Sequence, residues 1–501
     1  HCFSKLMKIK KFIMPFLFGL IGIFAFSPFS IKFLIYLSYA YLIHLVLFSK
    51  TSTLSKIFAW GIGHWGFGMS WIIVSIYYYG ETGIIMASII FLLLVILLTT
   101  VFTCPLCLII KLFKYTYFKN NIIKILYISS FFLSIELTRY FFLNGVPWLI
   151  PGDIFLDTYT QNIYSIFGVS FASLIIYMLS TLAAINKKNK HNLIIIGIIF
   201  ITLIPEIKKA DKEADYPISI IQPSSDPLLK YEKDYYKKIE KNLINLFTKL
   251  PDESLLVVLP EAELPYSIQD IRFQEFFNKL PKSKNIVMGA WSYENSKLYN
   301  TVYNAKSGEN YKKRHLVPFG EYIPFLGFLR GLIDFFDLPM SNVQKGPKNQ
   351  KNIDMVINND DFLFSKGGIA SPICFEIAFQ NTVRKMNKSS NFMINVSNDT
   401  WFGNSIGPYH HLNITRVRAI ENNKWIIRAT NDGFSAIISN NGTIVDILNK
   451  GQTGLINGKI NLNNHNRTIF SKYGYVVSYL VVFLLIIFQT YQVYNFKKNE
   501  E

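Results

Sequence analysis

Eight stretches of this sequence are apolar over about the length that a helix needs to cross a lipid bilayer. Seven of them lie before residue 207, and one lies close to the C-terminus. The hydrocarbon core of a bilayer is roughly 30 Å thick, so a helix that crosses it needs about 20 largely apolar residues. We therefore expect eight membrane-spanning helices within the windows 12–29, 31–49, 57–79, 83–110, 122–143, 163–185, 192–206 and 474–493.

The composition agrees with a protein that lies in a membrane. Half of the 501 residues are hydrophobic, 17% are charged, and the mean hydropathy is +0.26. A soluble enzyme of this length carries more charge. A disordered chain does not contain 16% aromatic residues. A purely soluble globule and a disordered chain are both excluded.

The positions of the lysines predict the orientation of the helices. Cytoplasmic loops of membrane proteins retain Lys and Arg. With the N-terminus inside, the inner loops and ends hold fifteen lysines, and the short outer loops hold only Lys32. We therefore expect a seven-helix bundle over 1–206, an extracytoplasmic domain over 207–473, and a C-terminal helix with a cytoplasmic tail over 474–501. This arrangement explains most of the net charge of +18 without nucleic acid as a partner.

Two ionisable residues lie at membrane depth in the fifth window. Glu136 and Arg139 are three positions apart, so they can pair on one face of a helix. A charge in the hydrocarbon region is costly unless it is paired or hydrated. An internal ion pair and a place at a substrate entrance are the two interpretations of this spacing.

Residues 207–473 show the pattern of an α/β domain. Short apolar runs bounded by turn residues predict buried strands, and charged stretches of helical length lie between several of them. Asn441-Gly442 predicts a tight hairpin turn. We expect sheets covered by helices, with strands in ISIIQ, SLLVVLP, NIVMGAW, GGIASPIC, NFMINVSND, FSAIISN and TIVDIL.

Three residues of this domain lie where strands end or loops begin, which is where rigid scaffolds present reactive groups. Glu261 follows the run that ends at Pro260, Lys313 lies in YKKRHLVPFGEYIP, and Cys374 ends GGIASPIC. Cys374 is the only cysteine between 207 and 473, so the domain cannot form an internal disulfide. An unpaired thiol in an oxidising compartment is either buried and inert or kept as a nucleophile. The spacing alone leaves both readings open.

At these positions the sequence resembles the apolipoprotein N-acyltransferase family of the nitrilase superfamily, bacterial enzymes that add the third acyl chain to lipoproteins. The resemblance covers nearly the whole chain. Its motifs are AFSPF, GFGMSWIIVSI, ELTR and GVPW before residue 149, and PEAELP, KRHLVPFGEYIP, DLPM, PICFE, SNDTWFG and GPYHHL in the domain.

The resemblance implies a membrane bundle of eight helices with a nitrilase-like αββα sandwich outside the membrane. It also implies a catalytic triad of Glu261, Lys313 and Cys374. Glu321, Phe375 and Glu376 would support the triad. The family often has Tyr where Phe375 stands and Trp where Tyr231 stands, so the details of positioning differ here.

The activity that the resemblance implies is an acyl transfer in two steps. A phospholipid donates an acyl chain to the Cys374 thiolate, and the thioester passes it to the N-terminal amine of a diacylated apolipoprotein. Glu261 would act as general base. Lys313 would ionise the thiol and, with the backbone N–H of Phe375, stabilise the oxyanion. The location would be the bacterial inner membrane with the catalytic domain on the periplasmic face. We expect a monomer, lipids as partners, no nucleic acid, no metal and no cofactor.

Two further features of the domain have more than one interpretation. His410 and His411 are adjacent and face apart on a regular element, so we interpret both as structural. The apolar segment 321–340 is either a lipid-facing arm over the site or ordinary packing.

Two rival functions remain open at the level of the sequence. A membrane-tethered amidase or nitrile hydrolase would use the same triad with water as acceptor, but a single helix would suffice as its anchor. A transporter or lipid-binding protein would have no need of Glu261, Lys313 and Cys374 together.

Overall fold

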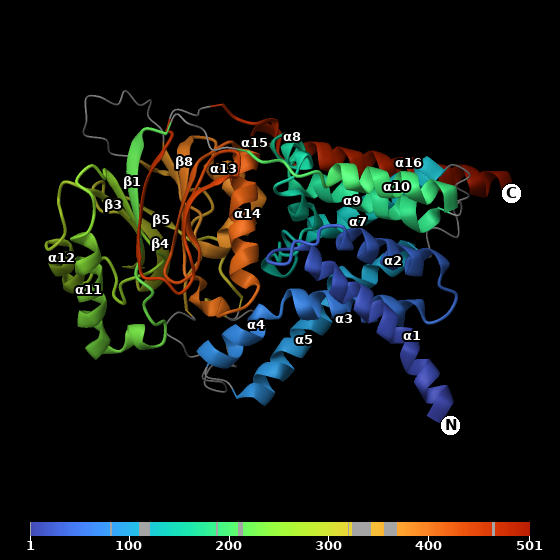
Figure 1. Ribbon diagram of the computed structural model, residues 1–501, viewed down its shortest axis with the longest axis horizontal. Helices are drawn as coiled ribbons and strands as arrows, with labels where there is room; N and C mark the ends of the chain where they lie inside the picture. Colours follow the sequence, from blue (N-terminus) through green and yellow to red (C-terminus); the bar gives the residue numbers. More distant parts are fainter. Residues whose placement is uncertain are drawn as a thin grey trace. The chain divides into compact units, whose positions relative to one another are not determined.

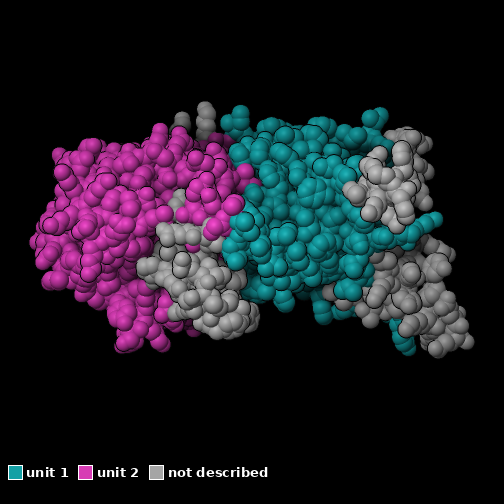
Figure 2. All heavy atoms as spheres, turned by 90° about the horizontal axis from the view of Figure 1, so that it is seen from below, with its two compact units in different colours: residues 1–73, 85–207, 473–501 teal, residues 74–84, 208–472 magenta. Residues whose placement is uncertain are grey.

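The computed structural model describes residues 2–80, 83–109, 121–186, 189–208, 214–318, 320–322, 342–354, 368–462 and 466–500. These residues form two compact units, which Figure 2 shows in different colours. The first unit comprises residues 1–73, 85–207 and 473–501, and the second comprises 74–84 and 208–472.

The first unit is built of helices, and each of the eight apolar windows contains one (Figure 1). On α5, Ile85, Leu92 and Leu93 leave more than half of their surface exposed. Such large exposed apolar side chains are typical of a surface that faces lipid or a partner. The helices are α1 (Cys2–Ile21), α2 (Leu34–Phe48), α3 (Thr53–Gly68), α4 (Trp71–Val74), α5 (Ile84–Phe102), α7 (Asn121–Thr138), α8 (Tyr164–Phe167), α9 (Val169–Ile185), α10 (Asn189–Thr202) and α16 (Val476–Glu500).

The number of helices that are long and apolar enough to cross a membrane is smaller than eight. Among the described residues two helical stretches qualify, Ile84–Ile109 and Asn121–Thr138. A third span is added if Thr53–Gly68 and Trp71–Tyr78, which meet at a bend of 52°, count as one. The other apolar helical stretches are only 10–17 residues long, Val476–Leu485 of α16 among them, so the prediction of eight spans is not confirmed.

The two ionisable residues of the fifth window do not form the ion pair that their spacing suggested. Glu136 Oε2 instead accepts a hydrogen bond from the Tyr177 hydroxyl at 2.7 Å. Arg139 Nη1 donates to the carbonyl oxygen of Leu149 at 3.2 Å, and its guanidinium lies over the Trp65 ring. Each group thus has its own hydrogen-bond partner, although the charges of the two residues still act on each other.

The second unit contains two six-stranded sheets. The first has the strand order β12-β1-β2-β3-β4-β5 and the second has β11-β10-β9-β8-β7-β6. Strands β1, β2 and β3 are parallel to one another, and so are β7, β8 and β9. The strands are β1 (Tyr216–Gln222), β2 (Leu256–Leu259), β3 (Asn285–Glu294), β4 (Lys297–Asn304), β5 (Asn310–Lys312), β6 (Ile353–Asp354), β7 (Gly368–Ala370), β8 (Ser390–Ser397), β9 (Ile426–Thr430), β10 (Ser435–Ile438), β11 (Ile444–Leu448) and β12 (Gly454–Ile460).

The two sheets face each other and helices cover their outer faces (Figure 1). Gln222 of β1 accepts hydrogen bonds from the hydroxyls of Thr430 and Ser435 in the other sheet. Helices α11 (Lys233–Phe247) and α12 (Ile271–Phe277) pack an apolar core on the first sheet. Helices α13 (Gln380–Met386) and α14 (Gly407–Asn422) lie on the outer face of the second sheet. The predicted sandwich of two sheets between helices is confirmed.

The predicted hairpin turn is also confirmed. Strands β10 and β11 pair antiparallel around Asn441-Gly442, and the N–H of Ser439 donates to the carbonyl of Thr443 at 2.9 Å. Gly442 has a φ of +82°, a conformation that a side chain would strain.

Candidate active site

The three residues predicted to be catalytic each lie within four residues of the end of a strand. Glu261 follows β2 after Pro260, Lys313 follows β5 directly, and Cys374 follows β7 and begins a short 3₁₀ helix, Cys374–Ala378. Residues after the carboxyl ends of parallel strands gather at one edge of a sheet, where α/β folds place their ligands. Here two sheets contribute such ends.

Lys313 lies between two carboxylates. Its Nζ is 3.0 Å from Glu261 Oε1 and 2.9 Å from Glu321 Oε1. The amide of Asn300 donates to the same two oxygens, at 2.7 Å and 3.1 Å. Burial lowers the pKa of Lys313, but the charges of Glu261, Glu321 and Cys374 offset this and raise the pKa above its ordinary value. The lysine is therefore a fixed cation at neutral pH.

The neighbours of the two chosen residues have other partners. Lys312 Nζ pairs with Glu294 at 2.6 Å, and Glu263 accepts a hydrogen bond from the Ser225 hydroxyl. Of the two lysines Lys312 and Lys313, and of the two glutamates Glu261 and Glu263, it is Lys313 and Glu261 that contact each other.

Glu261 is held from the backbone side as well. Its Oε2 accepts a hydrogen bond from the backbone N–H of Asn398, just beyond β8, at 3.0 Å. The strand β3 passes directly behind it at Gly289, where a Cβ would lie 2.4 Å from the Glu261 Cα. Only glycine permits this approach.

Cys374 has a backbone conformation that is unusual for a residue with a side chain. Its φ is +48°, in the left-handed region. Such strain at a non-glycine residue is found mainly at functional sites. Glu261 and Lys313 lie close enough to the thiol for the charges of both to act on its pKa.

The surroundings of Cys374 favour the protonated thiol over the thiolate. Burial and then the charge of Glu261 raise the pKa of Cys374, and Lys313 lowers it by less. Two carboxylates already compensate the single positive charge of Lys313, so little of its field is left for the sulfur. The raised pKa favours the protonated thiol, in contrast to the expected resting thiolate, and a base is then needed to remove the proton.

Glu376 connects the loop of the lysine to the turn of the cysteine. Its Oε1 accepts hydrogen bonds from the backbone N–H groups of Arg314 and His315, and its Oε2 accepts one from Ile373. The Phe375 ring packs edge-on against Phe379, with 5.2 Å between the ring centres. The buried carboxylate of Glu376 thus has a structural role, because it holds the segment after Lys313 next to the segment around Cys374.

Three residues of this site were not found from the sequence. Asn300 and Asn398 contact Glu261, and His411 contacts the backbone of Cys374. His411 was interpreted as a structural histidine. The motifs SNDTWFG and GPYHHL contained two of these residues, and nothing in the sequence around Asn300 distinguishes it.

Comparison with known proteins gives two family matches on this chain. The Carbon-nitrogen hydrolase family matches residues 219–469, and the Apolipoprotein N-acyltransferase N-terminal domain matches residues 18–182. An apolipoprotein N-acyltransferase from Pasteurella multocida is 30% identical over 485 residues, with 88% of each chain covered. The chain belongs to the apolipoprotein N-acyltransferase family. A second member, from Haemophilus ducreyi, is 28% identical and covers 97% of this chain and 98% of its own.

The apolar segment 321–340 was expected to be either a lipid-facing arm over the site or ordinary packing. Most of the apolar segment 321–340 lies outside the described residues, since 323–341 are not described. Only Glu321 and Tyr322 of this segment are described.

The described residues contain no group of three or more His, Cys, Asp or Glu arranged to hold a metal ion.

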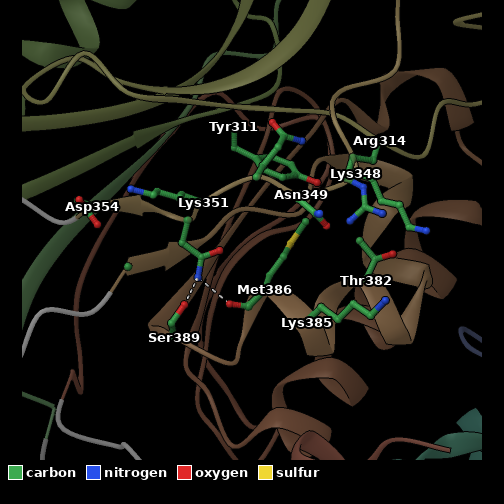
Figure 3. A pocket seen from close by; sticks show the side chains of 13 residues that line it. Tyr311, Arg314, Lys348, Asn349, Lys351, Asp354, Thr382, Lys385, Met386 and Ser389 are labelled. Carbon is green, nitrogen blue, oxygen red and sulfur yellow. Dashed lines mark hydrogen bonds between the residues drawn. The ribbon is translucent and has the colours of Figure 1, made fainter.

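A cavity of about 380 Å³ lies apart from this site in the second unit. Tyr311, Arg314, Lys348, Lys351 and Lys385 contribute to its lining (Figure 3). None of Glu261, Lys313 and Cys374 lines it. This basic cavity is therefore not part of the candidate active site.

Proposed function

We propose that this chain is a phospholipid-dependent N-acyltransferase that acylates the N-terminal amine of diacylated apolipoproteins through a thioester on Cys374. The observation that carries the proposal is the bridge of Lys313 between Glu261 and Glu321 beside this thiol, in a chain of this family.

Glu261 is the general base of the proposal. Its Oε2 accepts one hydrogen bond, from Asn398, so a lone pair is left for the proton of the thiol. Lys313 keeps its own proton, because its pKa is raised. A positioned base contributes roughly 10²- to 10⁴-fold to the rate.

In the first half-reaction the sulfur attacks the ester carbonyl of a phospholipid while Glu261 takes the thiol proton. The ammonium of Lys313 and the backbone N–H of Phe375 stabilise the oxyanion. The tetrahedral intermediate then expels the lysophospholipid oxygen, which receives the proton from Glu261. An acyl thioester remains on Cys374.

In the second half-reaction the α-amine of the diacylglyceryl-cysteine attacks the thioester. Glu261 takes a proton from the amine, the amide forms, and the sulfur leaves and receives that proton from Glu261. No reactant other than the two substrates is consumed, and the enzyme returns to its starting state. A covalent intermediate of this kind gives ping-pong kinetics.

The proposal includes the location of the protein. Eight helices would cross the bacterial inner membrane, with both termini in the cytoplasm. The sandwich would be the catalytic domain and would lie on the periplasmic face. The protein would be a monomer. The fifteen lysines at the inner ends, against Lys32 outside, support this orientation. The exposed apolar residues of α5 support contact with lipid.

Hydrolysis by the same triad is not favoured. The match to the N-terminal domain of the acyltransferases covers residues 18–182, which a tethered hydrolase would not need.

The proposal is tested by product analysis in detergent micelles with a phospholipid and a synthetic diacylated lipopeptide. The parent chain should yield the N-acylated lipopeptide and an equal amount of lysophospholipid. Cys374→Ala should yield neither. Release of free fatty acid in place of the amide, by the parent chain, would instead identify a hydrolase.

A further inference from the structure

The backbone of the nucleophile is contacted by a histidine that the scheme above does not use. His411, in α14, is buried, with 1% of its side chain exposed. Its Nε2 lies 3.1 Å from the carbonyl oxygen of Cys374. A carbonyl oxygen only accepts, so this contact is a hydrogen bond when Nε2 carries a proton.

The imidazole is fixed on its other side by two charged residues. Nδ1 lies 2.9 Å from Asp399 Oδ1 and 3.1 Å from Arg428 Nη2. Arg428 in turn donates to Asp399 Oδ2 at 2.6 Å, and the hydroxyl of Ser397 donates to Asp399 Oδ1 at 2.7 Å. Both Asp399 and Arg428 are fully buried. The ring therefore cannot turn without breaking a buried network of charges.

The carbonyl that His411 contacts belongs to a peptide group with a second role. The carbonyl of Cys374 and the N–H of Phe375 lie in one planar unit and point in opposite directions when the peptide is trans. Only a cis bond at Ser27-Pro28 is present among the described residues, so this peptide is trans. Fixing the carbonyl fixes the direction of the N–H.

We propose that His411 is a positioning residue, which holds the Cys374–Phe375 peptide plane so that the Phe375 N–H is directed at the oxyanion. The left-handed φ of Cys374 makes such a restraint necessary, because a strained backbone relaxes where nothing holds it. Asp399 and Arg428 act through His411, not on the substrate. This inference rests on the proposed function, since the oxyanion arises in acyl transfer.

Two reactions of Cys374 separate positioning from general packing. Acylation by a phospholipid passes through an oxyanion, whereas alkylation by iodoacetamide displaces iodide and has none. His411→Phe keeps an aromatic ring for the edge-on contact with Phe402 but has no donor. It should lower the rate of acyl-enzyme formation about 10²-fold, the usual cost of one oxyanion donor. The alkylation rate should stay within about threefold of the parent, as the thiol itself is unchanged.

His411→Gln and His411→Asn form the matched pair. Gln places an amide N–H near the position of Nε2, and Asn places it near Nδ1. Acyl-enzyme formation should therefore be about tenfold faster in His411→Gln than in His411→Asn. This comparison tests the positioning role of His411 even if His411→Phe does not fold.

Acylation of His411→Phe at the parent rate, a parallel fall of acylation and alkylation, or equal acylation by the Gln and Asn variants would each overturn the inference. A parent chain that forms no acyl-enzyme would refute the proposed function itself, a different outcome that is visible before any variant is made.

Discussion

The backbone N–H of Arg314 donates a hydrogen bond of 2.6 Å to Glu376 Oε1. Arg314 follows the lysine of the site, and Glu376 lies two residues beyond the cysteine. With the N–H of His315, which donates to the same oxygen, it joins the lysine loop of the first sheet to the cysteine turn of the second. The relative position of cation and thiol therefore depends on the carboxylate of Glu376.

Glu376→Ala should destabilise the fold and lower acylation together. It leaves the N–H groups of Ile373, Arg314 and His315 without their acceptor; the Ile373 donor is buried, and an unsatisfied buried donor costs roughly 1–3 kcal/mol. We expect a fall of at least about 2 kcal/mol in the free energy of unfolding. Thermal unfolding in detergent measures it, with exposed Glu275→Ala as the control. A variant as stable as the parent would contradict the structural role of Glu376.

Glu261→Gln should increase the reactivity of the thiol and abolish acyl transfer. After burial, the charge of Glu261 is the largest cause of the raised pKa of Cys374, and Lys313 acts in the opposite direction. Without that negative charge the pKa falls, more thiolate is present at a given pH, and alkylation becomes faster. Acylation should instead fall by roughly 10²- to 10⁴-fold, because the proposed general base is lost.

The measurement is the pH profile of iodoacetamide alkylation beside the rate of acyl transfer. In the parent the alkylation rate should still rise above pH ~8.5, the pKa of a free thiol. A parent profile with a plateau near neutral pH would show a resting thiolate and contradict this account.

The strain at the nucleophile predicts an order of stability among two inactive variants. An alanine at position 374 keeps the left-handed φ of +48°, which costs a residue with a Cβ about 1–2 kcal/mol, whereas glycine adopts it freely. Cys374→Gly should be the more stable by roughly 1 kcal/mol in chemical unfolding. An alanine variant of equal or greater stability would show that the turn is not strained.

Gly289→Ala should displace Glu261. The added methyl group would lie 2.4 Å from the Glu261 Cα and 2.6 Å from the Ala262 nitrogen, closer than any stable contact. We expect at least a tenfold loss of acyl transfer and a loss of stability of about 1–3 kcal/mol. Gly454→Ala is the matched strand control, since its nearest neighbour would be 3.6 Å away. Equal activity of the two variants would count against the close approach at Glu261.

The helices and most strands could be predicted because each depends on a local pattern. The eight apolar windows each contain a helix, and the Asn441-Gly442 turn forms as its residues require. The window 57–79 was taken as one span, yet the chain bends by 52° after Gly68. Strands β4, β5, β6, β9 and β12 were not predicted. Arg428 interrupts the apolar run of β9, and several residues of β12 are not buried.

The site was less predictable because its contacts join distant residues. Asn398 and Glu261 are 137 positions apart, and His411 and Cys374 are 37 apart. The resemblance to the family indicated Glu261, Lys313 and Glu321, which the fold brings together. It did not indicate the raised pKa of Cys374, since that depends on the sum of several charges and on burial.

The most direct test of the account is the covalent state of Cys374 during turnover. The parent chain is mixed with a phospholipid that has a labelled acyl chain, digested, and its peptides are weighed; the lipopeptide is then added to a second sample. We predict one labelled peptide, containing Cys374 and sensitive to hydroxylamine, whose label moves to the lipopeptide amine. N-acylated product formed without label on that peptide, or formed equally by Cys374→Ala, would contradict the account.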